Sequence, residues 1–307
     1  MVEAPTGQPS DSDAARMRAR PPESTLRWLV DSLDARLVDT VEAMPGGSTC
    51  AMHRIGIVLR DGSTQTVVMR RYVLADRVGD ATAVAAQEMR ALEIVRQLGV
   101  PTPEPLAGDP AASVTDVPTV VMSLVDGQPV WDTRAKRQWI AQIVTAMVAL
   151  HEIDANDYLP AIARYEQAVY EPPRWSERPA MWESAFQLFH GPMPASDVGF
   201  VHRDFNPGNV LWTRGRLTGL VDWQAACNGP RSIDPAHCCL NLLYYDPAMA
   251  RDLRLEWEHQ SGRSYEPWAD LMSIGGALDS FRTRRKPSNT TAAIEDVLAR
   301  AVTDLTG

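Results

Sequence analysis

With 307 residues, 45% of them hydrophobic and 22% charged, the chain has the composition of an ordinary globular protein and the length to divide into two lobes. Its net charge of −9 argues against nucleic acid or an anionic membrane surface as the main partner, and no apolar run approaches the ~20 residues of a membrane span. Because the N-terminus lacks the apolar core of a signal peptide and the four cysteines make no disulfide framework, we expect a cytoplasmic protein that binds neither nucleic acid nor membrane.

Residues 1–22 are polar, rich in Pro, Ala and Arg and without hydrophobic period, so they predict a disordered tail. The segment 23–125 predicts a small, β-rich lobe. It begins with a short helix in STLRWLVDSL, which Ser24 or Thr25 would cap. Asp61-Gly62 is a strong turn signal between two apolar runs and indicates a β-hairpin. The elements expected in this lobe are strands over 54–59, 65–70 and 118–124 and a helix over 82–98.

Residues 126–307 predict a larger, mostly helical lobe. In WIAQIVTAMVALHEI, apolar residues such as Ile140, Val144 and Met147 recur at helical spacing. Arg214-Gly215 marks the turn of a small hairpin among the helices. A β-rich lobe joined to a helical lobe leaves a cleft between them, which is the usual place for a ligand. The helices expected here lie at 139–153, 178–190, 235–245, 247–261, 267–282 and 290–304.

The segment 200–223, which reads FVHRDFNPGNVLWTRGRLTGLVDW, contains two acids and an amide at spacings that suit phosphoryl transfer. The hairpin that follows Asn209 returns Asp222 close to it, so residues thirteen apart in sequence become neighbours in space. Transfer from a nucleotide needs a carboxylate to orient and deprotonate a hydroxyl, and oxygen ligands for Mg²⁺. We therefore interpret Asp204 as the catalytic base and Asn209 and Asp222 as Mg²⁺ ligands.

These residues also have ordinary structural explanations. An Asp in a loop that contains Pro and Gly usually closes a turn, and Asp222 would be a solvated residue at the end of a strand. The occurrence of His202, Asp204, Asn209 and Asp222 in one segment favours function instead. His202 is interpreted as an orienting residue that hydrogen-bonds the loop backbone, not as a proton shuttle.

Glu88 lies on the apolar stripe of the helix expected over 82–98. An acid on such a stripe needs a partner, because an unpaired buried charge is costly. Arg70, at the end of a strand, is the available cation, since Arg71 faces the opposite way. The pair would clamp the phosphates of a nucleotide. The alternative is a glutamate at the exposed rim of the helix.

Three further segments carry weaker signals. The backbone of Gly47 and Ser48 precedes the hairpin and could cover phosphates, although Gly-Gly-Ser turns are common. Asp234-Pro235 begins a helix, and N-capping by Asp234 explains it at least as well as a catalytic role. The run His237-Cys238-Cys239 suits core packing better than a metal site, because adjacent ligands fit a tetrahedral site poorly.

These motifs resemble those of the aminoglycoside phosphotransferase (antibiotic kinase) family, relatives of the choline kinases with a protein-kinase-like fold. HRDFNPGNVLW is similar to its catalytic loop, VDW to its metal-binding segment and GPRSIDPAHCCLNL to the helix that follows. EMRALEIVRQLGVPTPEPLA and VVMSLVDGQPV resemble its Glu-bearing helix and its interlobe hinge, so the resemblance covers about residues 24–285. It implies an α+β, bilobal fold with ATP or GTP and Mg²⁺ in the cleft, and with Met122 and Leu124 offering hinge backbone to the base.

Two departures from the family pattern matter. Arg70 stands where Lys is usual, although several relatives also use Arg, and it keeps the charge with a different reach. The loop reads His-Arg-Asp, the protein-kinase form, where antibiotic kinases more often have His-Gly-Asp. Only eleven residues separate Asp222 from Asp234, too few for the activation segment of a protein kinase, and no Ala-Pro-Glu follows.

We expect a small-molecule kinase that transfers the γ-phosphate of a nucleoside triphosphate to a hydroxyl of an aminoglycoside-like or other natural-product acceptor. A metabolite kinase for an amino alcohol or sugar, or a nucleotide-binding pseudokinase, is the alternative. Residues 23–125 would bind the nucleotide and 126–307 the acceptor, whose identity the sequence leaves open, as it does the oligomeric state. Acids and aromatic residues that could bind the acceptor are Glu183, Asp246, Glu256, Glu258, Asp279, Trp175, Trp182, Tyr244, Tyr245, Trp257 and Trp268.

Overall fold

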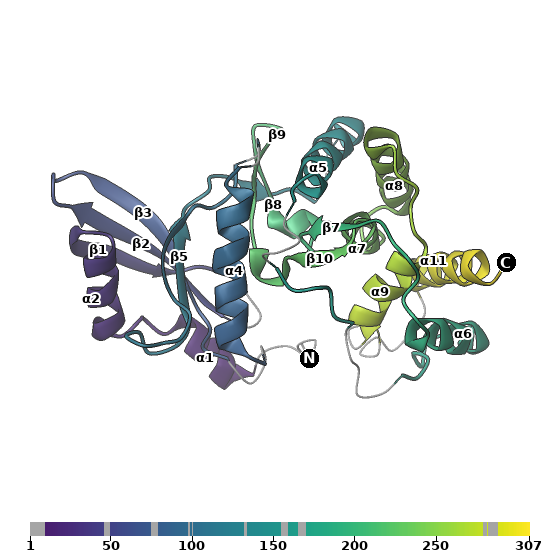
Figure 1. Ribbon diagram of the computed structural model, residues 1–307, viewed down its shortest axis with the longest axis horizontal. Coiled ribbons are helices and arrows are strands. Elements are labelled where there is room, and N and C mark those ends of the chain that lie inside the picture. The colour runs from purple at the N-terminus through teal and green to yellow at the C-terminus, as the bar shows by residue number, and fades with distance from the viewer. Residues whose placement is uncertain are drawn as a thin grey trace.

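The protein has a small β-rich lobe and a larger helical lobe, as the sequence predicts (Figure 1). Among the described residues, no helix combines the length and the apolar character needed to cross a lipid bilayer. The computed structural model describes residues 10–45, 50–74, 79–97, 99, 101–131, 134–154, 159–164, 170–278, 281 and 288–307.

The small lobe is built on a five-stranded antiparallel sheet in the order β1-β2-β3-β5-β4. The three predicted strands are confirmed as β2, β3 and β5. The strands β1 and β4 were not predicted from the sequence. Both missed strands lie at the edges of the sheet, where one pairing partner is enough and the apolar pattern is weak. The strands are β1 (Ala35–Ala43), β2 (Ala51–Leu59), β3 (Thr64–Arg71), β4 (Pro105–Asp109) and β5 (Thr119–Ser123).

Helices cover both faces of this sheet. Helix α2 (Glu23–Ser32) packs Leu29 against Val67 and its neighbours on one face. Helix α4 (Ala81–Val95) covers the other face and stands between the sheet and the large lobe (Figure 1). Because side chains alternate along a strand, Val67 and Arg70 of β3 fall on opposite faces, and Arg70 points toward α4.

The prediction of a disordered tail is wrong for part of residues 1–22. Residues Asp11–Arg18 form helix α1, which Ser10 begins with a capping box that includes Asp13. Met17 of this helix packs against Val73 and neighbouring apolar residues. This short helix has no hydrophobic period, and its cap, the contact of Met17 and a hydrogen bond from Arg16 to the Val73 carbonyl hold it in place. Residues 1–9 lie outside the described residues.

The predicted cap of α2 is also wrong. Its N-cap residue is Pro22, and no side chain caps it. Thr25 is buried inside the helix, and its Oγ1 donates to Asp116 Oδ1 at 2.9 Å. Asp116 also accepts from Arg71, so this acid ties the helix to the sheet.

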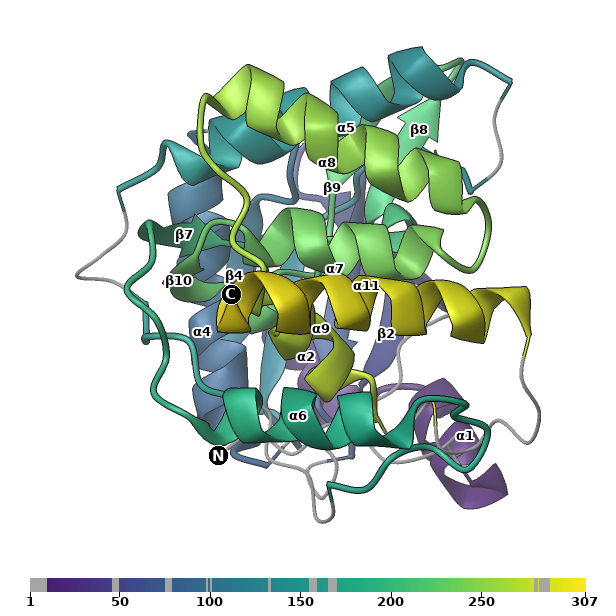
Figure 2. The same cartoon turned by 90° about the vertical axis from the view of Figure 1, so that its right-hand side faces the viewer.

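The large lobe contains the helices predicted from sequence, with ends that differ by a few residues. Figure 2 shows α5 and α8 at the top, α7 and α11 below them and α6 at the bottom. Within the predicted helix 267–282, α9 ends at Gly276, and the described residues Leu278 and Phe281 are helical again. The helices are α5 (Lys136–His151), α6 (Pro179–His190), α7 (Ile233–Leu242), α8 (Pro247–Ser261), α9 (Trp268–Gly276) and α11 (Asn289–Thr306).

Two small sheets carry the segment 200–223. In one, β7 pairs with β10, and in the other β8 lies between β6 and β9. The predicted hairpin turn at Arg214-Gly215 is present, with positive φ at both residues. The strands and short 3₁₀ turns are β6 (Gln128–Pro129), β7 (Val198–Val201), η1 (Pro207–Asn209), β8 (Val210–Thr213), β9 (Arg216–Leu220), η2 (Trp223–Ala225) and β10 (Cys227–Pro230).

Candidate active site

The loop between β7 and β8 presents the carboxylate of Asp204. Asn206 Nδ2 donates to Asp204 Oδ1 at 2.9 Å, and Asn209 Nδ2 donates to Asp204 Oδ2 at 3.0 Å. Asn209 also reaches the backbone carbonyl of Asp204 at 2.9 Å. Two amide side chains therefore hold the carboxylate in one orientation, while 38% of its side chain remains exposed to solvent.

His237 of α7 contacts the same carboxylate, with Nε2 3.0 Å from Asp204 Oδ1. The sequence analysis assigned the run 237–239 to core packing, which describes the buried Cys238 but is wrong for His237. The sequence contained a signal for this contact of His237. His237 lies three residues after Asp234, a spacing that places both side chains on the face of α7 that meets the loop.

The pKa of Asp204 is held below its ordinary value. Desolvation by the surrounding protein favours the neutral acid, but the hydrogen bond and charge of His237 outweigh it, with smaller contributions from His202 and Asn206. The carboxylate is therefore ionised at neutral pH and can accept a hydrogen bond from a hydroxyl group. A group with a low pKa is a weak base, so it accepts a proton only when that proton has become acidic.

Asp234 fixes the backbone that precedes the catalytic loop. Its carboxylate is fully buried and accepts from the backbone N–H groups of His202 at 3.0 Å and Arg203 at 2.7 Å. His151 Nε2 lies 3.0 Å from the same carboxylate. Arg203 has a φ of 67°, a conformation that non-glycine residues rarely adopt, and these bonds hold it there.

The prediction that Asp234 caps α7 is therefore wrong. The helix begins at Ile233 after Ser232, and no side chain caps it. An N-cap accepts from its own helix, whereas Asp234 accepts from a loop 31 residues earlier in the chain. The sequence could not show this, because the loop reaches Asp234 only through the packing of β7 against α7.

The hairpin β8–β9 brings Asn209 and Asp222 together as predicted. The backbone N–H of Val221 donates to the carbonyl of Asn209 at 3.0 Å, which places the next residue, Asp222, beside it. His202 Nε2 lies 3.1 Å from the Val221 carbonyl, so this histidine contacts loop backbone as predicted. Asn209 uses its amide nitrogen on Asp204, which leaves its amide oxygen as the atom for a metal ion.

Arg70 joins the two lobes at this point. Its Nη1 lies 2.7 Å from Glu88 Oε1 and 2.7 Å from Asp222 Oδ1. Arg70 and Glu88 are buried, so the predicted pair exists and the alternative of a rim glutamate is wrong. Tyr72 donates its hydroxyl to the other oxygen of Glu88 at 2.7 Å. Burial alone would lower the pKa of Arg70, but Asp222 and Glu88 outweigh it and raise that pKa.

A cavity of about 420 Å³ lies between the lobes, a size that suits a small ligand. Its walls come from the sheet and from the segment after β5. Of the predicted hinge residues, Met122 lies in β5 and Leu124 directly follows it, and both line the cavity. Arg70, Asn209 and Asp222 line its inner end. Among the described residues, the buried Nε of Arg70 has no hydrogen-bond partner, and the residue brings a positive charge to this end of the cavity.

The predicted phosphate-covering residues Gly47 and Ser48 lie outside the described residues. Their described neighbours Ala43, Met44 and Met52 line the same cavity. The cavity offers a carboxylate and an amide oxygen as metal ligands, and a guanidinium group as a positive charge. Mg²⁺ prefers oxygen ligands and commonly bridges a carboxylate to nucleotide phosphates, so these residues fit a Mg²⁺–nucleotide complex.

Most of the aromatic residues considered for the acceptor belong to the core. Trp182 and Trp257 are almost completely buried, and Trp175 and Trp268 are nearly so. Tyr245 is the exception, because 54% of it is exposed.

Tyr245 stacks on Trp131, with ring centroids 4.7 Å apart. Trp131 in turn lies against the catalytic loop, where a Cβ added to Gly208 would be 2.9 Å from its ring. The sequence analysis did not include Trp131, and its isolated position after the hinge offered no signal.

Two of the acids considered for the acceptor are engaged with other residues. Asp246 accepts from the N-terminal backbone of α8 and lies 2.5 Å from Lys136. Glu256 accepts from Gln260, one turn along α8. Asp279 lies outside the described residues.

Comparison with known proteins identifies the family of this chain. The model of the phosphotransferase enzyme family matches residues 58–271 of this chain. A homoserine kinase of Rhodospirillum rubrum is 27% identical over 166 residues, which make up 48% of this chain and 49% of that protein. The chain therefore spans about half the length of this curated relative.

Solved structures with little sequence identity share the fold. The streptomycin–ATP–APH(2″)-IIa ternary complex has a TM-score of 0.57 at 14% identity, covering 86% of this chain and 91% of that one. Macrolide 2′-phosphotransferase MphH from Brachybacterium faecium has a TM-score of 0.56 at 16% identity, covering 92% and 98%. Since the family model extends over more than half of the sequence, this chain belongs to the phosphotransferase enzyme family.

Proposed function

We propose that the protein is a small-molecule kinase that transfers the γ-phosphate of ATP to a hydroxyl group. The observation that carries the proposal is the connection among three residues. Asn209 holds the Asp204 carboxylate with its amide nitrogen, and its backbone carbonyl bonds the residue before Asp222. A base and two metal ligands are thus held together where an interlobe cavity meets the catalytic loop.

In this proposal the nucleotide occupies the interlobe cavity. Its base lies against the backbone at Met122 and Leu124, and its phosphates lie toward Arg70. Asn209 and Asp222 would hold Mg²⁺, which would supply positive charge against the phosphates. Arg70 is kept in place by Glu88 and Asp222, so its positive charge is held at one fixed position. The structure of a fold relative that contains ATP supports nucleotide use.

Asp204 positions the acceptor hydroxyl and receives its proton. As the acceptor oxygen bonds to the γ-phosphorus, the bond from phosphorus to the bridging oxygen breaks and ADP leaves. The proton becomes acidic only late in this step, which suits a carboxylate of low pKa. His237 and the two amides keep the carboxylate oriented throughout.

For the acceptor, we propose first a natural product of the aminoglycoside-like or macrolide kind. The Trp131–Tyr245 pair beside the catalytic loop, in which Tyr245 is exposed, would suit the face of a sugar ring or another flat surface. An amino alcohol such as homoserine is the second candidate, favoured by the homoserine kinase similarity. Both candidates offer a hydroxyl group to the same base.

A phosphate-transfer screen with mass detection tests the function. The panel contains aminoglycosides, macrolides, homoserine and N-acetylated amino sugars, each with ATP and Mg²⁺. We expect one class to gain a single phosphate group, with the Asp204→Ala variant as the inactive control. Tight ATP binding without transfer to any member of the panel would instead support a nucleotide-binding pseudokinase.

A further inference from the structure

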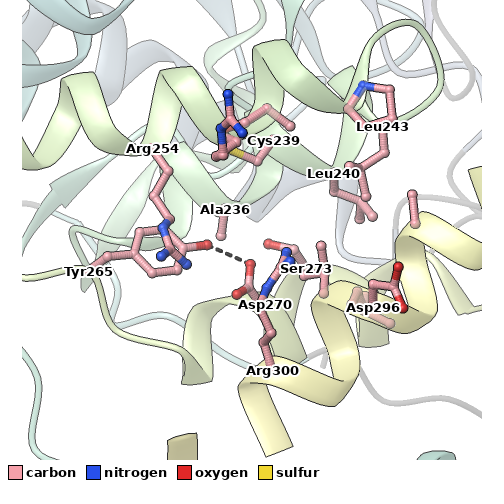
Figure 3. Close-up of a pocket in the computed structure, with 16 residues that line it drawn as sticks. Ala236, Cys239, Leu240, Leu243, Arg254, Tyr265, Asp270, Ser273, Asp296 and Arg300 are labelled. Atoms are coloured by element: carbon pink, nitrogen blue, oxygen red, sulfur yellow. Dashed lines mark hydrogen bonds between the residues drawn. The ribbon is translucent and has the colours of Figure 1, made fainter.

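A second cavity of about 340 Å³ lies in the large lobe, among helices α7, α8, α9 and α11 (Figure 3). Its size and mostly apolar wall are typical of a small-molecule site between helices. The residues that line it are Ala236, Cys239, Leu240, Leu243, Pro247, Ala250, Arg251, Arg254, Tyr265, Asp270, Ser273, Ile274, Ala293, Asp296, Val297 and Arg300.

This cavity is distinct from the interlobe cavity. Asp204, Asn209 and Asp222 do not line it. Helix α7 borders both the catalytic loop and the second cavity, because its His237 contacts Asp204 while its Leu240 lines the cavity. The proposed phosphoryl transfer assigns no role to this second cavity.

The inner wall of the cavity carries polar groups that apolar packing does not explain. Tyr265 donates its hydroxyl to Asp270 Oδ1 at 2.5 Å (Figure 3). Ser273 is 5% exposed, and its Oγ has no hydrogen-bond partner within the described part of the chain. A buried hydroxyl without a partner is costly, so a group that completes its hydrogen bonding is expected in the cavity.

Two arginines extend toward Asp270 from different helices, Arg254 from α8 and Arg300 from α11 (Figure 3). Arg254 lies over the ring of Tyr265, 5.0 Å from its centroid. Across the residues that the structure describes, neither arginine forms an ion pair within 4.0 Å. Arg254 is partly exposed and Arg300 is exposed, so both guanidinium groups remain accessible to a ligand in the cavity.

The other charged residues at the opening are already paired. Arg251 contacts Asp252 at 3.2 Å, and Asp296 contacts Arg178 at 2.9 Å. Burial raises the pKa of Asp270 to about 6, against the opposing effects of Tyr265, Arg254 and Arg300. The carboxyl group of Asp270 carries at most one negative charge, whereas Arg254 and Arg300 together carry two positive charges, and Asp304 also acts on Asp270.

We propose that this cavity is a second ligand site, which binds a small carboxylate with a compact apolar body. The carboxylate lies between the guanidinium groups of Arg254 and Arg300, which are suited to bidentate contacts with planar anions. Ser273 donates its hydroxyl to the ligand. The apolar body packs against Leu240 and its neighbours on the wall.

Calorimetric titration with benzoate tests the site. Saturating Mg²⁺–ADP is present to fill the interlobe cavity, and benzylamine and benzyl alcohol serve as the cationic and neutral probes of similar size. We expect benzoate to bind and benzylamine not to bind. The double variant Arg254→Gln, Arg300→Gln should weaken benzoate binding by about tenfold or more, since charged hydrogen bonds are lost.

Arg251→Gln is the matched control, because Arg251 also borders the cavity but is paired with Asp252. It should leave benzoate affinity within about twofold. Ala293→Leu, which reduces the cavity without removing charge, should weaken binding as well. Thermal unfolding of each variant shows that the fold is retained.

Equal affinity for benzoate and benzylamine would overturn the proposal, as would benzoate binding that the double variant leaves unchanged. Loss of binding in Asp204→Ala alone would place benzoate beside the catalytic loop and would overturn the proposal too. The titration does not depend on phosphate transfer. Its failure is therefore distinguishable from failure of the proposed kinase function.

Discussion

Arg70 Nη1 lies 2.7 Å from Asp222 Oδ1, although 152 residues separate them in sequence. This ion pair joins the sheet of the small lobe to the end of the hairpin in the large lobe. The same guanidinium contacts Glu88 at 2.7 Å, so one buried cation serves two acids from different elements. The position of the proposed metal ligand Asp222 thus depends on how the two lobes meet.

Replacing Arg70 by Met should destabilise the protein by about 3–5 kcal/mol, because Glu88 would remain buried without a cation. Arg70→Lys should retain most of the stability. Urea-induced unfolding measures the difference. Arg71→Met is the matched control, since its partner Asp116 is 30% exposed and the loss should be smaller. Equal losses for the Arg70 and Arg71 variants would contradict the expectation.

Asp204→Ala should reduce kcat by about 10²–10⁴-fold or more while nucleotide affinity stays nearly unchanged. Asp204 lies in the catalytic loop and does not line the interlobe cavity. Steady-state kinetics and a nucleotide titration provide the two measurements. Turnover comparable to that of the unmodified protein would show that another group is the base.

Asp222→Asn should raise the Mg²⁺ concentration needed for half-maximal activity, because a charged oxygen ligand is replaced by a neutral one. The measurement is a metal titration of activity at fixed ATP. Asp246→Asn is a control, since this acid pairs with Lys136 at the start of α5. An Mg²⁺ dependence that is the same in both variants would argue against Asp222 as a ligand.

His237→Phe should move the acidic limb of the pH–rate profile to higher pH. His237 is the main group that lowers the pKa of Asp204, so its removal raises that pKa. Activity requires the ionised carboxylate and is lost as pH falls through this pKa, and the loss should therefore begin at a higher pH in the variant. A profile of reduced height but unchanged position would instead assign His237 a purely structural role.

Asp270→Asn should stabilise the protein at pH 7.5 relative to pH 4. Burial raises the pKa of Asp270 from 3.8 to about 6. Protonated Asp270 therefore stabilises the folded state fully below pH 3.8, and this stabilisation is lost as the pH rises through about 6. This loss amounts to about 3 kcal/mol at most. Asn carries no such charge, so the difference in unfolding free energy between variant and unmodified protein should grow in favour of Asn as pH rises. A difference independent of pH would contradict the assignment.

Local sequence patterns determined the parts of the site that depend on short-range geometry. A two-residue turn returns a strand beside its predecessor, which is why Asn209 and Asp222 could be placed together from sequence. Strand alternation likewise separated Arg70 from Arg71, and helical periodicity placed Glu88 on the face that meets Arg70. These inferences rest on short-range geometry, namely the hairpin turn, the strand period of two residues and the helical period of 3.6 residues.

Only the tertiary structure decided which distant elements these side chains contact. The packing of α7 against the catalytic loop lets the Asp234 side chain accept from loop backbone N–H groups. The same packing brings His237 to Asp204. The same packing leaves the cavity around Asp270 between four helices. Periodicity shows that a helix has a face but not what that face contacts, because the contact is set by packing between segments far apart in sequence.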